Sequence, residues 1–81
     1  MSYCRIGVDG SEVYAYQDCA GYCVVWHEGK STKVRGGLPK LRTFLSALRR
    51  RGIIVPEYAF EGIDHDIAED NSEAVARAMS T

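Results

Sequence analysis

Residues 36–52 read GGLPKLRTFLSALRRRG, and this stretch decides the fold because the pattern of apolar residues changes within it. Before it, apolar residues follow the period of two that is typical of strands. Within it they recur at Leu41, Phe44, Leu45 and Leu48. That spacing forms one stripe along a helix. Pro39 suits the first helical turn, and Gly52 stands where a helix needs a left-handed C-terminal residue. The stretch therefore separates a β half from an α half.

The β half predicts an antiparallel meander of three or four strands. The candidate strands are residues 3–8, 12–17, 22–27 and 31–35. Asp9-Gly10 favours a hairpin, and Glu28-Gly29 closes the third segment. The last segment is the weakest and carries Lys33 and Arg35, which is typical of an edge strand.

The α half predicts a helical hairpin on one face of this sheet. Residues 53–55 are apolar and are expected to form a buried connector before Pro56 opens the second helix. The inward-facing positions of that helix are Ala59, Phe60, Ile63 and Ile67. Residues 71–81 have little to bury and are expected to fray as a tail. The sequence thus predicts a single α+β domain over residues 1–70.

From size and composition we expect this domain to be cytoplasmic and not to span a membrane. The chain has 81 residues, one domain near the lower end of what a single core stabilises. It lacks both an apolar run of about 20 residues, which would span a bilayer, and the pattern of a signal peptide. Its three cysteines, Cys4, Cys19 and Cys23, are an odd number and poor material for a disulfide framework.

The charges are separated along the chain although the net charge is only −1. Residues 30–51 carry eight basic residues and no acid, whereas both flanking segments are acidic. Such asymmetry concerns partners and steering rather than fold. It indicates either a charged partner or internal neutralisation.

Three short motifs follow one another along the chain. They are Ser11-Glu12-Val13-Tyr14-Ala15-Tyr16, Gly21-Tyr22, and Gly52 followed by Val55-Pro56-Glu57-Tyr58-Ala59. Together they resemble a family of small uncharacterised proteins from actinobacteria and their phages. The family pattern implies closely spaced cysteines after the Gly-Tyr strand, of which only Cys23 is present here, and two histidines on the first helix, as in a zinc site. Those histidine positions fall at Phe44 and Leu48, so the resemblance implies that apolar packing has replaced a metal site.

Two groups of residues are candidates for metal binding or catalysis. The first is Cys19, Cys23 and His27. One strand would separate Cys23 from His27 by roughly 13 Å, too far for one zinc ion without a bend. The second group is the helical stripe Tyr58, Glu61, His65 and Glu69, which also fits a solvated helix face. Asp64 and Asp66 would add only to the negative field. We expect no metal, no cofactor and no catalytic residues, and hence not an enzyme.

The basic segment is a candidate interaction surface. On the first helix, Arg42, Ser46, Arg49 and Arg50 share the face away from Leu41 and Leu45. Nucleic acid would use such a patch for phosphate contacts, but the pI near 6.1 is low for a nucleic-acid-binding domain. A protein partner and neutralisation by the acidic second helix are the other two interpretations.

The predicted sheet has two apolar faces, and two short helices can cover only one. Strand alternation places Val13, Ala15, Cys23 and Val25 on one side, and Tyr14, Tyr16, Tyr22 and Trp26 on the other. Either the aromatic side chains form the core, or the aliphatic face lies under the helices and the aromatic face is a contact surface. Tyrosine and tryptophan are enriched at protein interfaces, and we expect the second arrangement.

The function predicted from these patterns is that of a small phage-type accessory protein. It would bind a host protein or itself through Tyr14, Tyr16, Tyr22, Trp26, Arg42, Arg49 and Arg50. The alternative is a nucleic-acid-binding module that uses residues 30–51.

Overall fold

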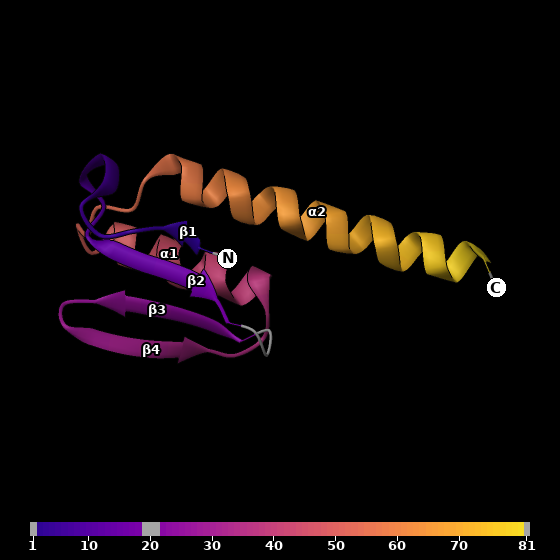
Figure 1. Ribbon diagram of the computed structural model, residues 1–81, viewed down its shortest axis with the longest axis horizontal. Helices are drawn as coiled ribbons and strands as arrows, with labels where there is room; N and C mark the ends of the chain where they lie inside the picture. Colours follow the sequence, from indigo (N-terminus) through magenta and orange to yellow (C-terminus); the bar gives the residue numbers. More distant parts are fainter. Residues whose placement is uncertain (1, 19–21, 81) are drawn as a thin grey trace.

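The computed structural model describes residues 2–18 and 22–80, with side chains through residue 71. Its elements are β1 (Ser2–Cys4), the 3-10 turn η1 (Val8–Gly10), β2 (Val13–Gln17), β3 (Cys23–His27), β4 (Lys30–Val34), α1 (Leu38–Arg50) and α2 (Glu57–Ser80). The four strands form one antiparallel sheet in the order β1-β2-β3-β4, and the two helices follow (Figure 1). The α+β fold predicted from the sequence is therefore confirmed.

The β3–β4 hairpin sets the register of the sheet. Its turn has two residues, Glu28 and Gly29, with positive φ values of 51° and 75°. Two residues of positive φ match the strand twist, which is why Gly is favoured there. The turn places Lys33 opposite Val24, and the next ladder places Tyr14 opposite Trp26. Side chains that share a face of the sheet follow from this register.

The first strand is shorter than residues 3–8, so that prediction is wrong in its extent. β1 ends at Cys4, its pairing with β2 is irregular, and the chain then turns through Gly7 with φ 87° and Asp9 with φ 52°. Left-handed residues at both positions end the extended conformation. Ile6 and Val8 are consequently about half exposed, at 51% and 47%.

The core lies between the inner face of the sheet and the two helices. Val13, Ala15, Cys23 and Val25 are buried on the sheet side. The helices contribute Leu38, Leu41, Leu45 and Leu48 from α1, and Ala59, Phe60 and Ile63 from α2. In Figure 1, α1 lies behind the sheet and α2 runs beside β1. The predicted stripes of both helices therefore face the core, with Phe44 and Ile67 only partly buried at its margin.

The connector between the helices is not buried throughout, which corrects the expectation for residues 53–55. Val55 is buried, but Ile54 is 53% exposed. The backbone explains the alternation: the Ile54 N–H donates to Glu12 Oε1 at 2.9 Å, and the Ile54 carbonyl accepts from the Glu12 N–H at 3.0 Å. These two hydrogen bonds hold the connector beside Glu12, just before β2. In this extended backbone the Val55 side chain points inward and the Ile54 side chain points outward.

The second helix continues past the rest of the molecule. α2 extends to Ser80, through most of the segment 71–81 that was expected to fray. At about 1.5 Å per residue its 24 residues span about 36 Å. This helix accounts for the long axis of a molecule measuring 46 × 23 × 19 Å (Figure 1). Among the described residues, no helix is long and apolar enough to cross a membrane.

Candidate binding surface

The outer face of the sheet is left uncovered by the helices in the described part of the chain. The arrangement expected from strand alternation is confirmed: the aliphatic side chains are buried, and the aromatic ones are on the opposite face. Trp26 is 42% exposed and Tyr22 is 49% exposed, while Tyr14 and Tyr16 are partly buried. Such exposed aromatic side chains are available for contact with a partner.

A shallow apolar depression of about 410 Å³ lies on this face. It is lined by Ile6, Tyr14, Tyr16 and Trp26. The rings of Tyr14 and Tyr16 are 5.0 Å apart and inclined by 77°, an edge-to-face arrangement that holds both in place. We call these four residues the apolar depression. Its lining is apolar and open to solvent.

A second depression, of about 370 Å³, lies at the end of the sheet where β3 begins. Tyr22, Lys33, Val34, Arg35, Gly36 and Gly37 line it. The Lys33 Nζ atom lies 4.6 Å from the centre of the Tyr22 ring, a cation–π contact. We call it the cationic depression, because its charged side chains are Lys33 and Arg35.

Two arginines of α1, Arg42 and Arg49, form ion pairs with acidic residues of α2. Arg42 donates to Asp64 at 2.6 Å, and Arg49 donates to Glu57 at 2.9 Å. Both guanidinium groups also lie over the Phe60 ring, at 5.4 and 5.0 Å from its centre. The hydrogen bond from Arg42 to Asp64 and the attraction between them raise the pKa of Arg42. For Arg42 and Arg49, the interpretation that applies is neutralisation by the acidic second helix.

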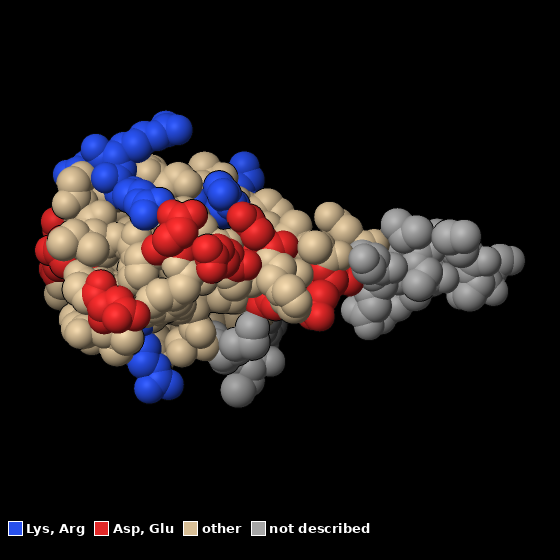
Figure 2. All heavy atoms as spheres, turned by 90° about the horizontal axis from the view of Figure 1, so that it is seen from above, with Lys and Arg blue, Asp and Glu red and all other residues tan. Residues whose placement is uncertain are grey.

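Arg50 remains at the edge of the same region. It lines a hollow of about 300 Å³ between the helices, together with Arg42, Ser46, Arg49, Glu57 and Phe60. Figure 2 looks onto this side of the molecule and shows basic and acidic side chains next to each other. Because carboxylates lie among the cations, the region is a mixed surface and a weak attractor for a polyanion.

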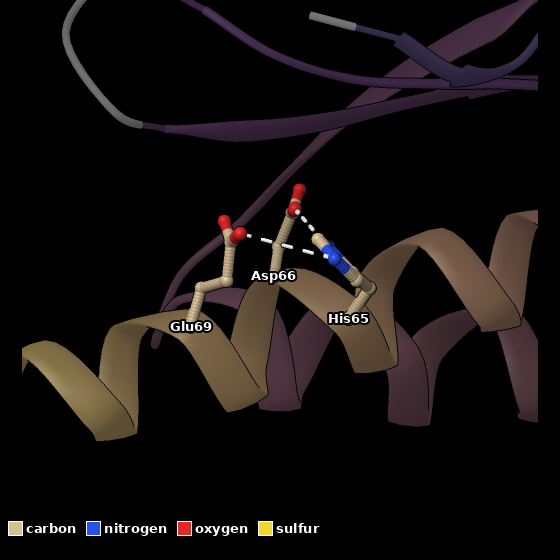
Figure 3. A group of neighbouring side chains, drawn as sticks. All are labelled: His65, Asp66 and Glu69. Carbon is tan, nitrogen blue, oxygen red and sulfur yellow. Dashed lines mark hydrogen bonds and ion pairs between the residues drawn. The ribbon is translucent and has the colours of Figure 1, made fainter.

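The predicted stripe on α2 was Tyr58, Glu61, His65 and Glu69, and the group of possible ligands in the structure differs from it. His65 and Glu69 come together, with His65 Nε2 3.8 Å from Glu69 Oε1 (Figure 3). The third member is Asp66, whose Oδ1 atom is 3.5 Å from His65 Nδ1. The three side chains can offer ligand atoms within 4.8 Å of one another. His65 and Glu69 are both well exposed, so the group is equally an ordinary i, i+4 pair on a solvated helix.

Asp66 does more than add to the negative field, which corrects that expectation. Its Oδ2 atom accepts a hydrogen bond of 2.6 Å from the Tyr3 hydroxyl. Burial and this hydrogen bond raise the pKa of Tyr3. Gly62, one turn earlier, leaves room for the ring, because a Cβ there would lie 3.3 Å from Tyr3 Cδ1. Asp64 likewise has a structural role as the partner of Arg42.

The cysteine candidates do not converge among the described residues. Cys23 and His27 stand at opposite ends of β3, and Cys19 lies outside the described residues. Cys23 is buried, and burial raises the pKa of its thiol, which disfavours the reactive thiolate. His27 packs against the Phe44 ring at 6.1 Å, and its buried Nδ1 atom has no hydrogen-bond partner among the described residues.

No family model, curated protein or solved structure matches this chain. The resemblance to phage proteins therefore stays an expectation. The surface includes Ile6, which was not predicted. It also includes Lys33 and Arg35, which the sequence placed in the basic segment 30–51, as an extension of its arginine face, and not on the aromatic face. The position of Lys33 on the aromatic face could have been predicted from the Glu28-Gly29 turn. A two-residue hairpin turn places Lys33 opposite Val24, whose side chain is on that face. Ile6 had no such signal, because residues 3–8 looked like a continuous strand.

Proposed function

We propose that this protein is a small accessory binding module that acts by protein–protein contact through the outer face of its sheet. The observation that carries the proposal is the uncovered aromatic face, on which Trp26 is 42% and Ile6 is 51% exposed. The core on the other face is complete without these side chains. Large aromatic residues kept at the surface without a packing role are typical of contact sites. The resemblance to phage proteins favours a host protein as the partner, and a second copy is the other candidate.

The arginines contribute less to this proposal than the aromatic residues do. Arg42 and Arg49 are already paired with Asp64 and Glu57. A nucleic acid that used them would have to compete with these carboxylates, which weakens the alternative of a module built on residues 30–51. We therefore place the contact surface on Tyr14, Tyr16, Trp26 and Ile6, with Tyr22 at its border.

Capture experiments test the proposal. Tagged wild-type protein, Tyr16→Ala and Trp26→Ala are used to capture partners from nuclease-treated host lysate, and light scattering measures self-association. Removing an anchor of this kind typically weakens binding by about 2 kcal/mol or more, roughly 30-fold. Both variants should lose the partner or the dimer while their circular dichroism stays native. The matched control is Tyr58→Ala, which removes an aromatic side chain that is 37% exposed on α2.

Two results would contradict the proposal. One is wild-type capture and oligomeric state in both Tyr16→Ala and Trp26→Ala. The other is capture that disappears with nuclease treatment, because the bound molecule would then be nucleic acid.

A further inference from the structure

Lys33 and Arg35 of the outer face differ from Arg42 and Arg49 of α1 in forming no ion pair with a carboxylate of the described residues. Lys33 and Arg35 are exposed, and no carboxylate of the described residues forms an ion pair with either. Arg42 and Arg49, in contrast, are both paired. The cationic depression therefore holds two cations that form no ion pair with a described carboxylate, next to the Tyr22 ring.

The two depressions lie on one face at a defined separation. Trp26, on β3, belongs to the apolar depression, and Tyr22, the residue just before β3, belongs to the cationic one, so they are four residues apart along the chain. At about 3.3 Å per residue this distance is about 13 Å. An extended peptide places side chains i and i+4 on one side at the same distance. The spacing of the site thus matches the spacing of an extended polypeptide.

We infer that the partner docks on the outer face as an extended acidic segment. It places an apolar side chain in the apolar depression and an aspartate or glutamate, four residues away, beside Lys33 and Arg35. This inference rests on the proposed function and specifies the chemistry of its partner. Apolar burial supplies affinity, and the acidic residue supplies orientation and selectivity.

The same face is a poor fit for a second copy of this chain. Along the paired strands, the outer side chains of β2, β3 and β4 are Tyr14, Tyr16, Val24, Trp26, Ser31 and Lys33. They include a lysine and no acid, so two such faces meeting would leave the cations without a complement.

Single-stranded nucleic acid is also disfavoured by the ring geometry. Successive bases stack on exposed aromatic faces. Here the Tyr14 and Tyr16 rings stand edge to face, and the Lys33 side chain covers the ring of Tyr22. An apolar side chain and a carboxylate use these surfaces better than stacked bases do.

Peptide selection followed by a mutant cycle tests the inference. A library of random peptides displayed on phage is selected on the immobilised wild-type chain, and the best binder is synthesised for titration. The expected consensus has an aspartate or glutamate four positions from a large apolar residue. Lys33→Glu and Arg35→Glu should each lower the affinity for the synthetic peptide about tenfold. This is the effect expected from losing an exposed charge pair and adding a repulsion. Changing the peptide's acid to its amide should remove most of that difference. Arg51→Glu, an equal charge change at the end of α1, should bind as wild type.

The outcomes separate the inference from the proposed function. Loss of binding in Trp26→Ala with wild-type affinity in Lys33→Glu and Arg35→Glu overturns the inference and leaves the proposed function standing. Wild-type binding in Trp26→Ala overturns both. A library without binders, a consensus without an acid at that spacing, competition by a deoxythymidine oligonucleotide, or a stable dimer that buries Trp26 also overturns the inference.

Discussion

Tyr3 joins the first strand to the second helix through one hydrogen bond, and this contact has a pH dependence. Burial and the bond to Asp66 raise the pKa of Tyr3 above its ordinary value of 10.0. As pH rises, the unfolded chain loses this proton first. The stabilisation is therefore complete below about pH 10 and declines above it, by about 1.4 kcal/mol per pH unit.

The variant Tyr3→Phe isolates this effect, because it keeps the ring over Gly62 and removes the ionisable group. The free energy of unfolding is measured for both proteins from pH 8 to 11. The advantage of the wild type over Tyr3→Phe should be constant up to about pH 10 and then shrink. A difference that stays constant over the whole range would contradict this role for Tyr3.

Leu48 and Phe44 occupy the positions where the family resemblance implies histidines, and their burial differs. Leu48 is 3% exposed, whereas Phe44 lies partly buried beside His27. Leu48→Ala should lower the free energy of unfolding in urea by about 2–5 kcal/mol. Phe44→Ala should lower it by less than the truncation of a fully buried phenylalanine would. The exposed Arg50→Ala on the same helix should change stability by no more than about 0.5 kcal/mol. A change below about 1 kcal/mol for Leu48→Ala would mean that this stripe does not face the core.

At the scale of the elements, the helical hairpin is held mainly by apolar packing and only slightly by its ion pairs. The Arg42–Asp64 pair is about half exposed on both sides, at 45% and 52%. Exposed pairs contribute about 0.2–1 kcal/mol and are screened by salt. A double-mutant cycle with Arg42→Ala and Asp64→Ala should give a coupling energy in that range, smaller at 1 M salt. A coupling above about 2 kcal/mol would show that the pair orients the helices.

The elements that the sequence predicted well are those in which local chemistry and packing agree. The Glu28-Gly29 turn and the Gly52 terminus have a local signal in residues that suit positive φ, and the stripe of α1 has a core to face. β1 and Ile54 were predicted less well, because their conformations depend on the left-handed turn at Gly7 and on the contact with Glu12. The contacts of Asp66 and Ile6 join residues far apart in the chain, and periodicity does not report such contacts.

At the scale of the whole molecule, burial and charge divide the protein into three regions. The helices and the inner sheet face form the core, and the α1–α2 side carries paired charges. The outer sheet face carries Tyr22 and Trp26, which are exposed, and Lys33 and Arg35, which form no ion pair with a described carboxylate. In our proposal, its apolar depression and these two exposed cations are the features that bind a partner.

Trp26 is the single tryptophan of the chain and lies in the apolar depression, so it reports directly on the proposed contact. The protein is labelled with 5-fluorotryptophan, and its fluorine NMR resonance is followed while the unlabelled captured partner, or the selected acidic peptide, is added. The account predicts a single resonance that shifts as the complex forms and loses its sensitivity to solvent. A complex that forms at full occupancy while the Trp26 resonance stays unchanged and solvent-exposed would contradict it.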